Sequence, residues 1–291
     1  MKQHVKTALA LTIIVATIVA FAYYITHHPQ IVDQLRHVPP WLLFALLSLY
    51  GVAFLGYMFV TRGSLHLYGK HIPLQENILF NAYSSLVNFF GPGQSGPAFR
   101  GVYLKKRHNL RVKHFVFTTL VYYGFFGVLN IMLVCAGSRP WWQTLLLMAL
   151  AGAGSVLVVL WYKKRSHIGK DARLTITNIA WIAAATVLQV IALLFIYALE
   201  LRSIQSDLSW AQISAYTGIA NLSVFVAITP GGIGIRESFL LFSTQLHHIS
   251  NTTIVAASVI DRAAYLVFLG LLFVLVIGLH AKDKLHIKDN V

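Results

Sequence analysis

The chain has 291 residues, of which 57% are hydrophobic and only 11% are charged, against about 25% charged residues in an ordinary soluble domain. The mean hydropathy of +0.68 excludes a soluble enzyme, a disordered tail and a fibrous repeat, and it predicts a polytopic membrane protein. The formal net charge of +14 would suggest nucleic acid as the partner of a soluble protein. In a membrane protein, Lys and Arg collect in cytoplasmic loops for topological reasons, so we expect no nucleic-acid partner.

Six apolar segments are long enough to cross a ~30 Å hydrocarbon core as helices. In chain order they are 7–26, 41–60, 114–136, 141–162, 175–199 and 251–280. The first of them follows a basic start and imitates a signal peptide. Its length of about 20 residues is nevertheless enough for a retained first helix.

Two further segments, 74–99 and 210–249, are apolar enough to enter the membrane, but each is broken in its middle by Pro and Gly, which cannot continue a helix without loss. The connecting segments place 18 Lys and Arg residues on one side and three on the other. The positive-inside rule assigns the richer side to the cytoplasm. Each broken segment must then return to the side from which it entered.

The predicted fold is an all-α integral membrane protein with six transmembrane helices and two opposed re-entrant helical hairpins. It forms one polytopic domain over residues 1–291, with both termini in the cytoplasm. Residues 82–88 match residues 215–221, and a Pro-Gly break follows each stretch. This similarity predicts an inverted structural repeat, an arrangement in which broken helices meet near the membrane midplane and which is typical of transporters.

Irregular backbone at membrane depth is tolerated only where it is buried in protein or lines a polar cavity, so the two breaks predict a cavity between them. Asn88 and Asn221 lie on the entering arms, where they either line that cavity or form hydrogen bonds between helices. Gly231, Gly232 and Gly234 follow the second break and would present backbone amides to an anion.

Charged residues also lie at membrane depth. Arg236 and Glu237 follow the second break directly, while Asp261 and Arg262 lie ~15 Å into the last span at 1.5 Å per residue. Ionisable groups at such depth indicate function by default. Together with Arg100 near the first break, three arginines face two acids, and the surplus positive charge suits a phosphate-bearing head group. Alternatively, Arg236–Asp261 and Glu237–Arg262 are ion pairs that only hold the hairpin to the last helix.

No catalytic or metal-binding motif is present, so we expect no catalytic residues, no metal and no cofactor.

These residues resemble those of a known family. The stretch from Pro230 to Glu237 resembles the Pro-Gly-Gly-x-Gly-x-Arg-Glu signature of the lysylphosphatidylglycerol synthase transmembrane-region family, also called flippase-like. The stretch from Asn88 to Leu104 is similar to that family's earlier motif, Asn-x-x-x-Pro-Gly-Arg-x-Gly-Glu-x-x-Arg. Gln94 stands here in place of the family's Arg and Pro97 in place of its Glu, and these departures weaken the case for a charged first hairpin.

The resemblance covers nearly the whole chain, and Arg262 near the start of the last helix also fits it. The soluble aminoacyl-transfer domain of full-length synthases has no counterpart in this sequence. The resemblance therefore implies a stand-alone membrane protein that translocates a lipid and does not aminoacylate one.

The leading hypothesis is a lipid translocator of the bacterial inner membrane that acts on an anionic phospholipid or a polyprenyl-phosphate-linked lipid. An intramembrane enzyme or an accessory subunit of envelope glycolipid synthesis is the alternative, in which the buried acids would act as acid and base. The expected substrate-binding residues are Asn88, Arg100, Asn221, Pro230, Gly231, Gly232, Gly234, Arg236, Glu237, Asp261 and Arg262.

Overall fold

A computed structural model describes most of the chain. The described residues are 38–91, 93, 95–138, 141–166, 175–229, 232 and 234–288, with Val19, Tyr23, Thr26 and His27. Throughout this part of the chain the regular structure is helical, and it contains no strand. The predicted first span lies almost entirely outside the described residues.

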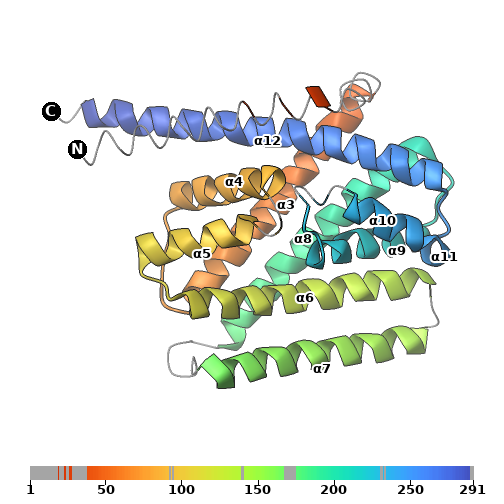
Figure 1. The fold of residues 1–291 in the computed structure, drawn as a ribbon, viewed down its shortest axis with the longest axis horizontal. Coiled ribbons are helices and arrows are strands. Elements are labelled where there is room, and N and C mark those ends of the chain that lie inside the picture. The colour runs from red at the N-terminus through yellow and green to blue at the C-terminus, as the bar shows by residue number, and fades with distance from the viewer. Residues whose placement is uncertain are drawn as a thin grey trace.

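Five long helices form the frame of the molecule (Figure 1). They are α3 (Pro40–His66), α6 (Val112–Ser138), α7 (Trp141–Ser166), α8 (Ile176–Ile204) and α12 (Asn251–Lys288). By length and composition, α3, α6, α8 and α12 could each cross a membrane, and α7 contains a shorter apolar stretch, Leu145–Trp161. The all-α class of the prediction is confirmed, and all five helices overlap predicted spans.

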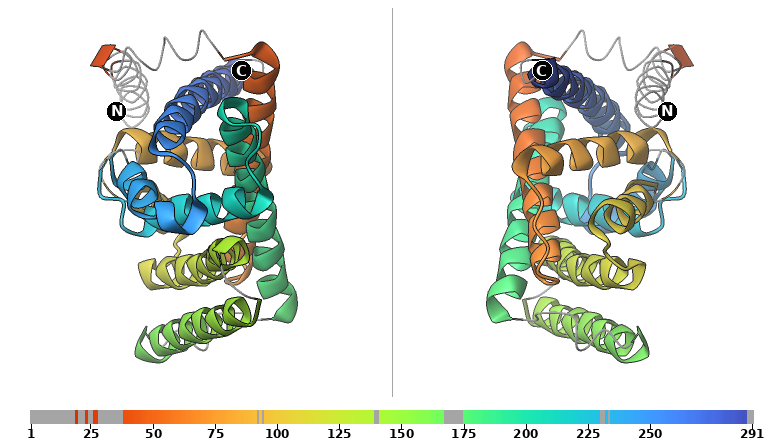
Figure 2. Two further views of the ribbon diagram at one scale, coloured as in Figure 1. Left: turned by 90° about the vertical axis from the view of Figure 1, so that its right-hand side faces the viewer. Right: turned by 90° about the vertical axis from the view of Figure 1, so that its left-hand side faces the viewer.

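Two helical hairpins fill the space between the long helices. The first consists of α4 (Leu74–Phe90) and α5 (Ser95–His108). The second consists of α9 (Trp210–Leu222) with the short helix η2 (Ser223–Phe225), followed by α10 (Ile235–Phe242) and α11 (Thr244–His247). Figure 1 shows the first hairpin entering from the left end and the second from the right end, and the end-on views of Figure 2 agree.

The two hairpins touch at their tips. The backbone N–H of Gly93 donates a hydrogen bond to the carbonyl of Ile228 at 2.9 Å. Gly93 belongs to the Pro-Gly break of the first hairpin, and Ile228 lies two positions before the break of the second. The breaks from opposite ends of the molecule therefore meet at its centre.

Capping interactions set where the helices of the second hairpin begin. Ser209 and Gln212 form a reciprocal capping box at the start of α9, which satisfies backbone donors that a helix start leaves free. Gly234 precedes α10 with φ of 81°, a conformation that favours glycine. The Glu237 carboxylate accepts a hydrogen bond from the Gly234 N–H at 2.8 Å and so closes the first turn of α10.

The base of the first hairpin is joined by a polar cluster outside the four candidate spans. Glu76 of α4 accepts a hydrogen bond from the Tyr103 hydroxyl at 2.6 Å and lies 2.9 Å from His108 Nε2, both on α5. Partial burial alone would raise the pKa of Glu76, but the hydrogen bonds with Tyr103 and His108 outweigh it and lower the pKa below the ordinary value. The cluster therefore favours an ionised Glu76.

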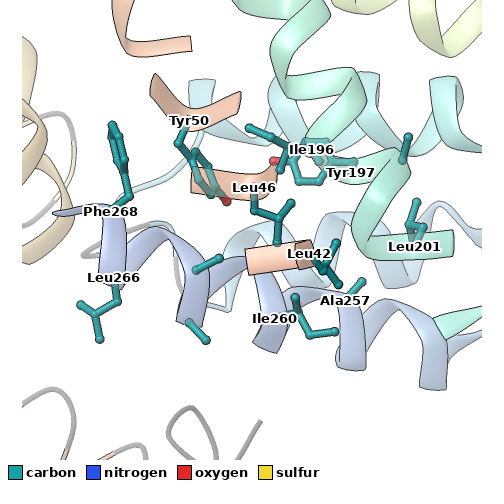
Figure 3. Close-up of a cluster of buried hydrophobic side chains, with 14 of the residues drawn as sticks. Leu42, Leu46, Tyr50, Ile196, Tyr197, Leu201, Ala257, Ile260, Leu266 and Phe268 are labelled. Carbon is teal, nitrogen blue, oxygen red and sulfur yellow. The ribbon is translucent and has the colours of Figure 1, made fainter. Parts of the chain in front are cut away.

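A tightly packed apolar core connects α3, α8 and α12 (Figure 3). Leu46, Ile196 and Leu269 have no exposed surface. Within a membrane such packing stabilises mainly through van der Waals contact, because lipid tails are as apolar as the core. The same cluster includes Tyr50 and Tyr197, whose hydroxyls lie against Asp261 and Arg236, respectively.

Candidate functional site

A cavity of about 320 Å³ lies where the hairpin tips meet, at the lower end of the range of about 300–1,000 Å³ typical of ligand pockets. Residues from α3, α4, α5, α6, α8, α9, α10 and α12 line it. Seven of the predicted site residues are among them: Asn88, Arg100, Asn221, Gly232, Arg236, Asp261 and Arg262. Of the rest, Gly234 and Glu237 lie within two positions of Arg236 in sequence, and Pro230 and Gly231 lie outside the described residues.

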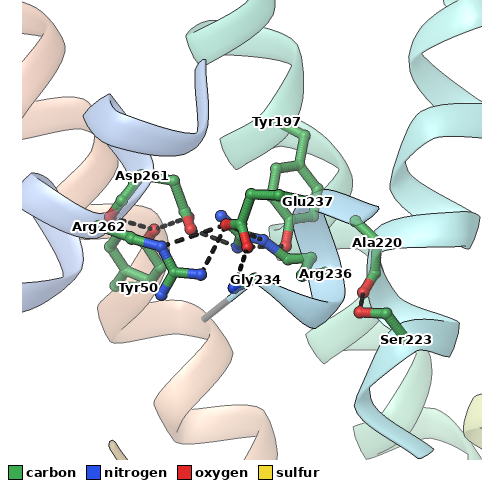
Figure 4. A network of polar contacts seen from close by, with 9 residues as sticks. All are labelled: Tyr50, Tyr197, Ala220, Ser223, Gly234, Arg236, Glu237, Asp261 and Arg262. Atoms are coloured by element: carbon green, nitrogen blue, oxygen red, sulfur yellow. Dashed lines mark hydrogen bonds and ion pairs between the residues drawn. The ribbon is translucent and has the colours of Figure 1, made fainter. Parts of the chain in front are cut away.

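Two ion pairs connect α10 to α12 (Figure 4). Arg236 Nη1 donates to Asp261 Oδ2. Arg262 donates to Glu237 Oε1 from Nη2 at 2.6 Å and from Nε at 3.2 Å. This is the pairing that the alternative interpretation of the sequence predicts, so at least part of the role of these four residues is to hold the second hairpin against the last helix.

The backbone amides of the second break are already engaged where the structure describes them. The Gly232 N–H donates to the carbonyl of Thr229 at 3.0 Å, and the Gly234 N–H donates to Glu237. In this arrangement neither amide is directed at an anion. The positive character of this part of the cavity therefore depends on arginine side chains.

Arg100 is in a different position from the other two arginines. It is 9% exposed, it lines the cavity, and its guanidinium carbon lies 4.0 Å from the centre of the Tyr57 ring. Among the described residues no carboxylate lies within 4.0 Å of Arg100, and its Nε has no hydrogen-bond partner. The positive charge that the sequence leaves without an acid is therefore located at Arg100.

The polar residues of the hairpin arms fall into two groups, which match the two roles that the sequence leaves open: hydrogen bonding between helices and lining of the cavity. Near the base of the first hairpin they hold helices together: Thr61 of α3 donates to Asn81 Oδ1 at 3.0 Å. Near the tips they line the cavity and also fix the local structure. Asn88 Oδ1 accepts from the Gly96 N–H at 3.2 Å, and Asn221 donates to Asn130 Oδ1 of α6 at 2.7 Å.

Sequence reasoning missed the tyrosines of the cavity wall. Tyr50 donates to Asp261 Oδ1 at 2.5 Å, and the Tyr197 hydroxyl lies 3.5 Å from Arg236 Nη1. The other tyrosines that line the cavity are Tyr57, Tyr122, Tyr123 and Tyr265. Several of them fall in the middle of predicted spans, where a hydroxyl needs a polar partner, and that position is the signal that could have revealed them.

Sequence reasoning also missed Glu200. The predicted span ends at residue 199, which places Glu200 in an outer loop, whereas α8 continues to Ile204 and Glu200 is fully buried. Its electrostatic neighbours are Asp261 and Arg236. The apolar residues on both sides of it, Leu199 and Leu201, are the signal that the span extends further.

A family model described as "Lysylphosphatidylglycerol synthase TM region" matches residues 7–272. The comparison with curated proteins gives no match. The matched region includes both hairpins, every predicted site residue and Glu200. The chain belongs to the lysylphosphatidylglycerol synthase transmembrane-region family.

Proposed function

We propose that this multi-pass membrane protein has six transmembrane helices and two re-entrant hairpins, with both termini in the cytoplasm of a bacterial cell and the chain in its inner membrane. The opposed entry of the hairpins supports this topology (Figure 1). So does the position of the basic segments 100–113 and 163–166, which lie at the end of the molecule where α6 begins and α7 ends.

The proposed function is translocation of an anionic phospholipid or a polyprenyl-phosphate-linked lipid between the two leaflets. The observation that carries the proposal is Arg100, a buried guanidinium that faces the cavity and has no carboxylate partner among the described residues. An isolated buried charge is costly, so such a group calls for an anionic ligand. Guanidinium binds phosphate through two parallel hydrogen bonds.

Different residues of the cavity suit different parts of a lipid. Arg100 holds the phosphate. Ser84 and Ser85 on α4 also line the cavity and suit polar parts of a head group. Phe54 and Phe268 line it as well and suit an acyl or prenyl chain. The backbone contact between Gly93 and Ile228 joins the tips, and parting of the tips would open the cavity toward one leaflet at a time.

Transport is preferred to catalysis because Asp261, which lines the cavity, is already engaged by Arg236 and Tyr50. A carboxylate held in this way is poorly placed to act as a general base, which must be within hydrogen-bond reach of the proton that it removes. Turnover of a lipid-linked substrate by the purified protein would favour the enzyme instead.

The direct test measures movement of fluorescent phosphatidylglycerol between leaflets in proteoliposomes. We expect Arg100→Gln to slow this movement about tenfold or more, since a hydrogen bond to a charged group contributes about 1.5–3 kcal/mol. Lys105→Gln is the matched control, because Lys105 is an exposed cation on the same helix. Equal rates in the wild type and both variants would contradict the proposed site.

A further inference from the structure

Arg100 lies between two cavities. A second cavity, of about 30 Å³, adjoins the larger one and extends between α3, α5 and α6 to Leu65 and Leu110 at the base of the first hairpin. The residues that line both cavities are Tyr57, Pro97, Arg100, Tyr122 and Tyr123. A phosphate bound by Arg100 therefore has space beside it for the outermost part of a lipid head group.

The smaller cavity suits a compact group. A cavity needs about 10–15 Å³ to hold one water molecule, so this one has room for about two groups of that size. The vicinal hydroxyls at the end of a glycerol head group are of this size, whereas a sugar ring is larger. The volume therefore favours a short head group.

The hydroxyls of the smaller cavity are placed to accept hydrogen bonds. Thr118 and Thr119 of α6 line it, and both donate their hydroxyl protons to the carbonyl of Phe115, at 2.9 and 2.8 Å. The hydroxyl of Tyr122, which also lines it, donates to Gln189 at 3.0 Å. Because these protons are already used within the protein, the three oxygens can only accept. A ligand group in this cavity has to supply the donors.

The charge of the site decides which donors are suitable. Within the described part of the chain, Arg100 is the only charged residue that lines the smaller cavity. Asp261 of the larger cavity is already engaged by Arg236 and Tyr50. An ammonium group beside Arg100 would meet a like charge with no free carboxylate to balance it. A neutral hydroxyl donates hydrogen bonds without that cost.

We propose that the smaller cavity selects phospholipids whose head group ends in hydroxyls, as a glycerol head group does, and rejects head groups that carry an ammonium. This inference rests on the proposed function and names the substrate class of the same site. Arg100 binds the phosphate where the cavities join, and the head-group hydroxyls donate to Thr118, Thr119 and Tyr122. The acyl chains stay on the side of the larger cavity.

The first test needs only the wild type and compares three acyl-labelled fluorescent lipids in proteoliposomes. They are phosphatidylglycerol, phosphatidylethanolamine and phosphatidylmethanol, which has the charge of phosphatidylglycerol but no head-group hydroxyl. At equal, low mole fractions we expect phosphatidylglycerol to move about tenfold faster than phosphatidylmethanol, as expected for about two neutral hydrogen bonds, and phosphatidylethanolamine to move most slowly. Equal rates for the three lipids would overturn the proposal.

Two variants test the residues. Thr119→Val replaces a hydroxyl by a methyl group of similar size, and it should reduce the preference for phosphatidylglycerol over phosphatidylmethanol about fivefold, as expected for one hydrogen bond. Pro97→Glu adds a carboxylate to the wall that both cavities share, in the first turn of α5, where an acid is favourable. It should lower the ratio of phosphatidylglycerol to phosphatidylethanolamine movement about tenfold or more.

The matched control for Pro97→Glu is Ala98→Glu. Ala98 is exposed and lines neither cavity, so the same charge one position further along the helix should leave the ratio as in the wild type. Equal ratios in the two glutamate variants, or an unchanged preference in Thr119→Val, would contradict the assigned residues.

The outcomes separate this inference from the proposed function. Movement of phosphatidylglycerol that depends on Arg100 but shows no preference over the other two lipids overturns the selectivity and leaves the proposed function standing. If the wild type moves none of the lipids, the proposed function fails, and native mass spectrometry of the purified protein decides the selectivity. Preferential retention of phosphatidylglycerol that falls in Thr119→Val supports it, and equal retention of the three lipids overturns it.

Discussion

The second hairpin holds its arginine in a closed network, in which Arg236 is bound by Asp261 and Tyr197 lies beside it. The first hairpin holds Arg100 over the ring of Tyr57, and no described carboxylate lies within ion-pair distance of it. Both arginines line the same cavity. The difference shows that two breaks of similar sequence can place their arginines in different surroundings, and it supports the proposal that Arg236 anchors the second hairpin while Arg100 binds the anion.

The hairpins also differ in what they are attached to. Asn88 and Ser95 connect the two arms of the first hairpin to each other, through hydrogen bonds to Gly96 and Val87. The first hairpin is also joined to α3 by neutral hydrogen bonds, from Thr61 to Asn81 and from Asn77 to the Met58 carbonyl, whereas the second is attached to the long helices through the α10–α12 ion pairs and through close packing of α9 against α6. The anchoring role of the second hairpin therefore has more than one structural basis.

The largest expected effect is a difference in the free energy of unfolding between a variant of Arg236 and a variant of Arg100. Arg236→Gln leaves Asp261 buried without its cation, and removal of one partner of a buried ion pair costs about 3–5 kcal/mol. Arg100→Gln removes an unpaired charge together with a contact to an aromatic ring worth about 0.5–2 kcal/mol, so we expect the free energy of unfolding to change by about 1 kcal/mol or less. Denaturant unfolding in detergent measures both variants. Equal losses in the two variants would remove the distinction between the hairpins.

A smaller effect tests the packing of the second hairpin. A Cβ atom at Gly218 of α9 would lie 2.9 Å from the backbone nitrogen of Val134 and 2.6 Å from its side chain. Gly218→Ala should therefore cost about 1–3 kcal/mol by overpacking. Gly270→Ala is the matched control, because nothing lies within 4 Å of a Cβ there and alanine favours a helix over glycine by about 1 kcal/mol. The prediction fails if both variants unfold at the same temperature.

The smallest effect concerns the base of the first hairpin and depends on pH. The pKa of Glu76 is lowered in the folded protein, so its contribution to stability is complete above its pKa in the unfolded chain and is lost as the pH falls through the lower, folded value. Reversible thermal unfolding between about pH 6 and pH 3 should show a steeper loss of stability toward low pH in the wild type than in Glu76→Gln. Parallel pH profiles would show that the Glu76 cluster contributes nothing.

Much of the fold follows from the sequence because long apolar runs and basic loops are strong local signals. The limits of α3 and α12 lie close to the predicted spans, and the breaks predict where the hairpins turn. The end of α8 was missed because a charged residue was taken as a loop residue. Glu200 is fully buried inside the helix, and its electrostatic neighbour Asp261 lies 61 positions further along the chain, where no local pattern could reveal it.

The candidate site was predicted by residue type more successfully than by role. The buried charges could be predicted from their depth within the predicted membrane segments alone. The pairing of Arg236 with Asp261 agrees with one of the two interpretations that the sequence left open. Which arginine lacks an acid could not be found in this way. That property depends on where α5 places Arg100 relative to the tyrosines of α3 and α6, and no spacing in the sequence encodes it.

The most direct measurement asks whether an anionic lipid occupies the cavity at Arg100. A photoactivatable phosphatidylglycerol probe would be crosslinked to the purified protein in phosphatidylcholine nanodiscs, and the labelled peptides identified by mass spectrometry. We predict labelling of segments 84–100 and 220–236 in the wild type and in Lys105→Gln, and about a tenfold loss or more in Arg100→Gln, as expected for a lost hydrogen bond to a charged group. Labelling of equal strength in all three proteins, or confined to the outer surface of the helices, would contradict the account.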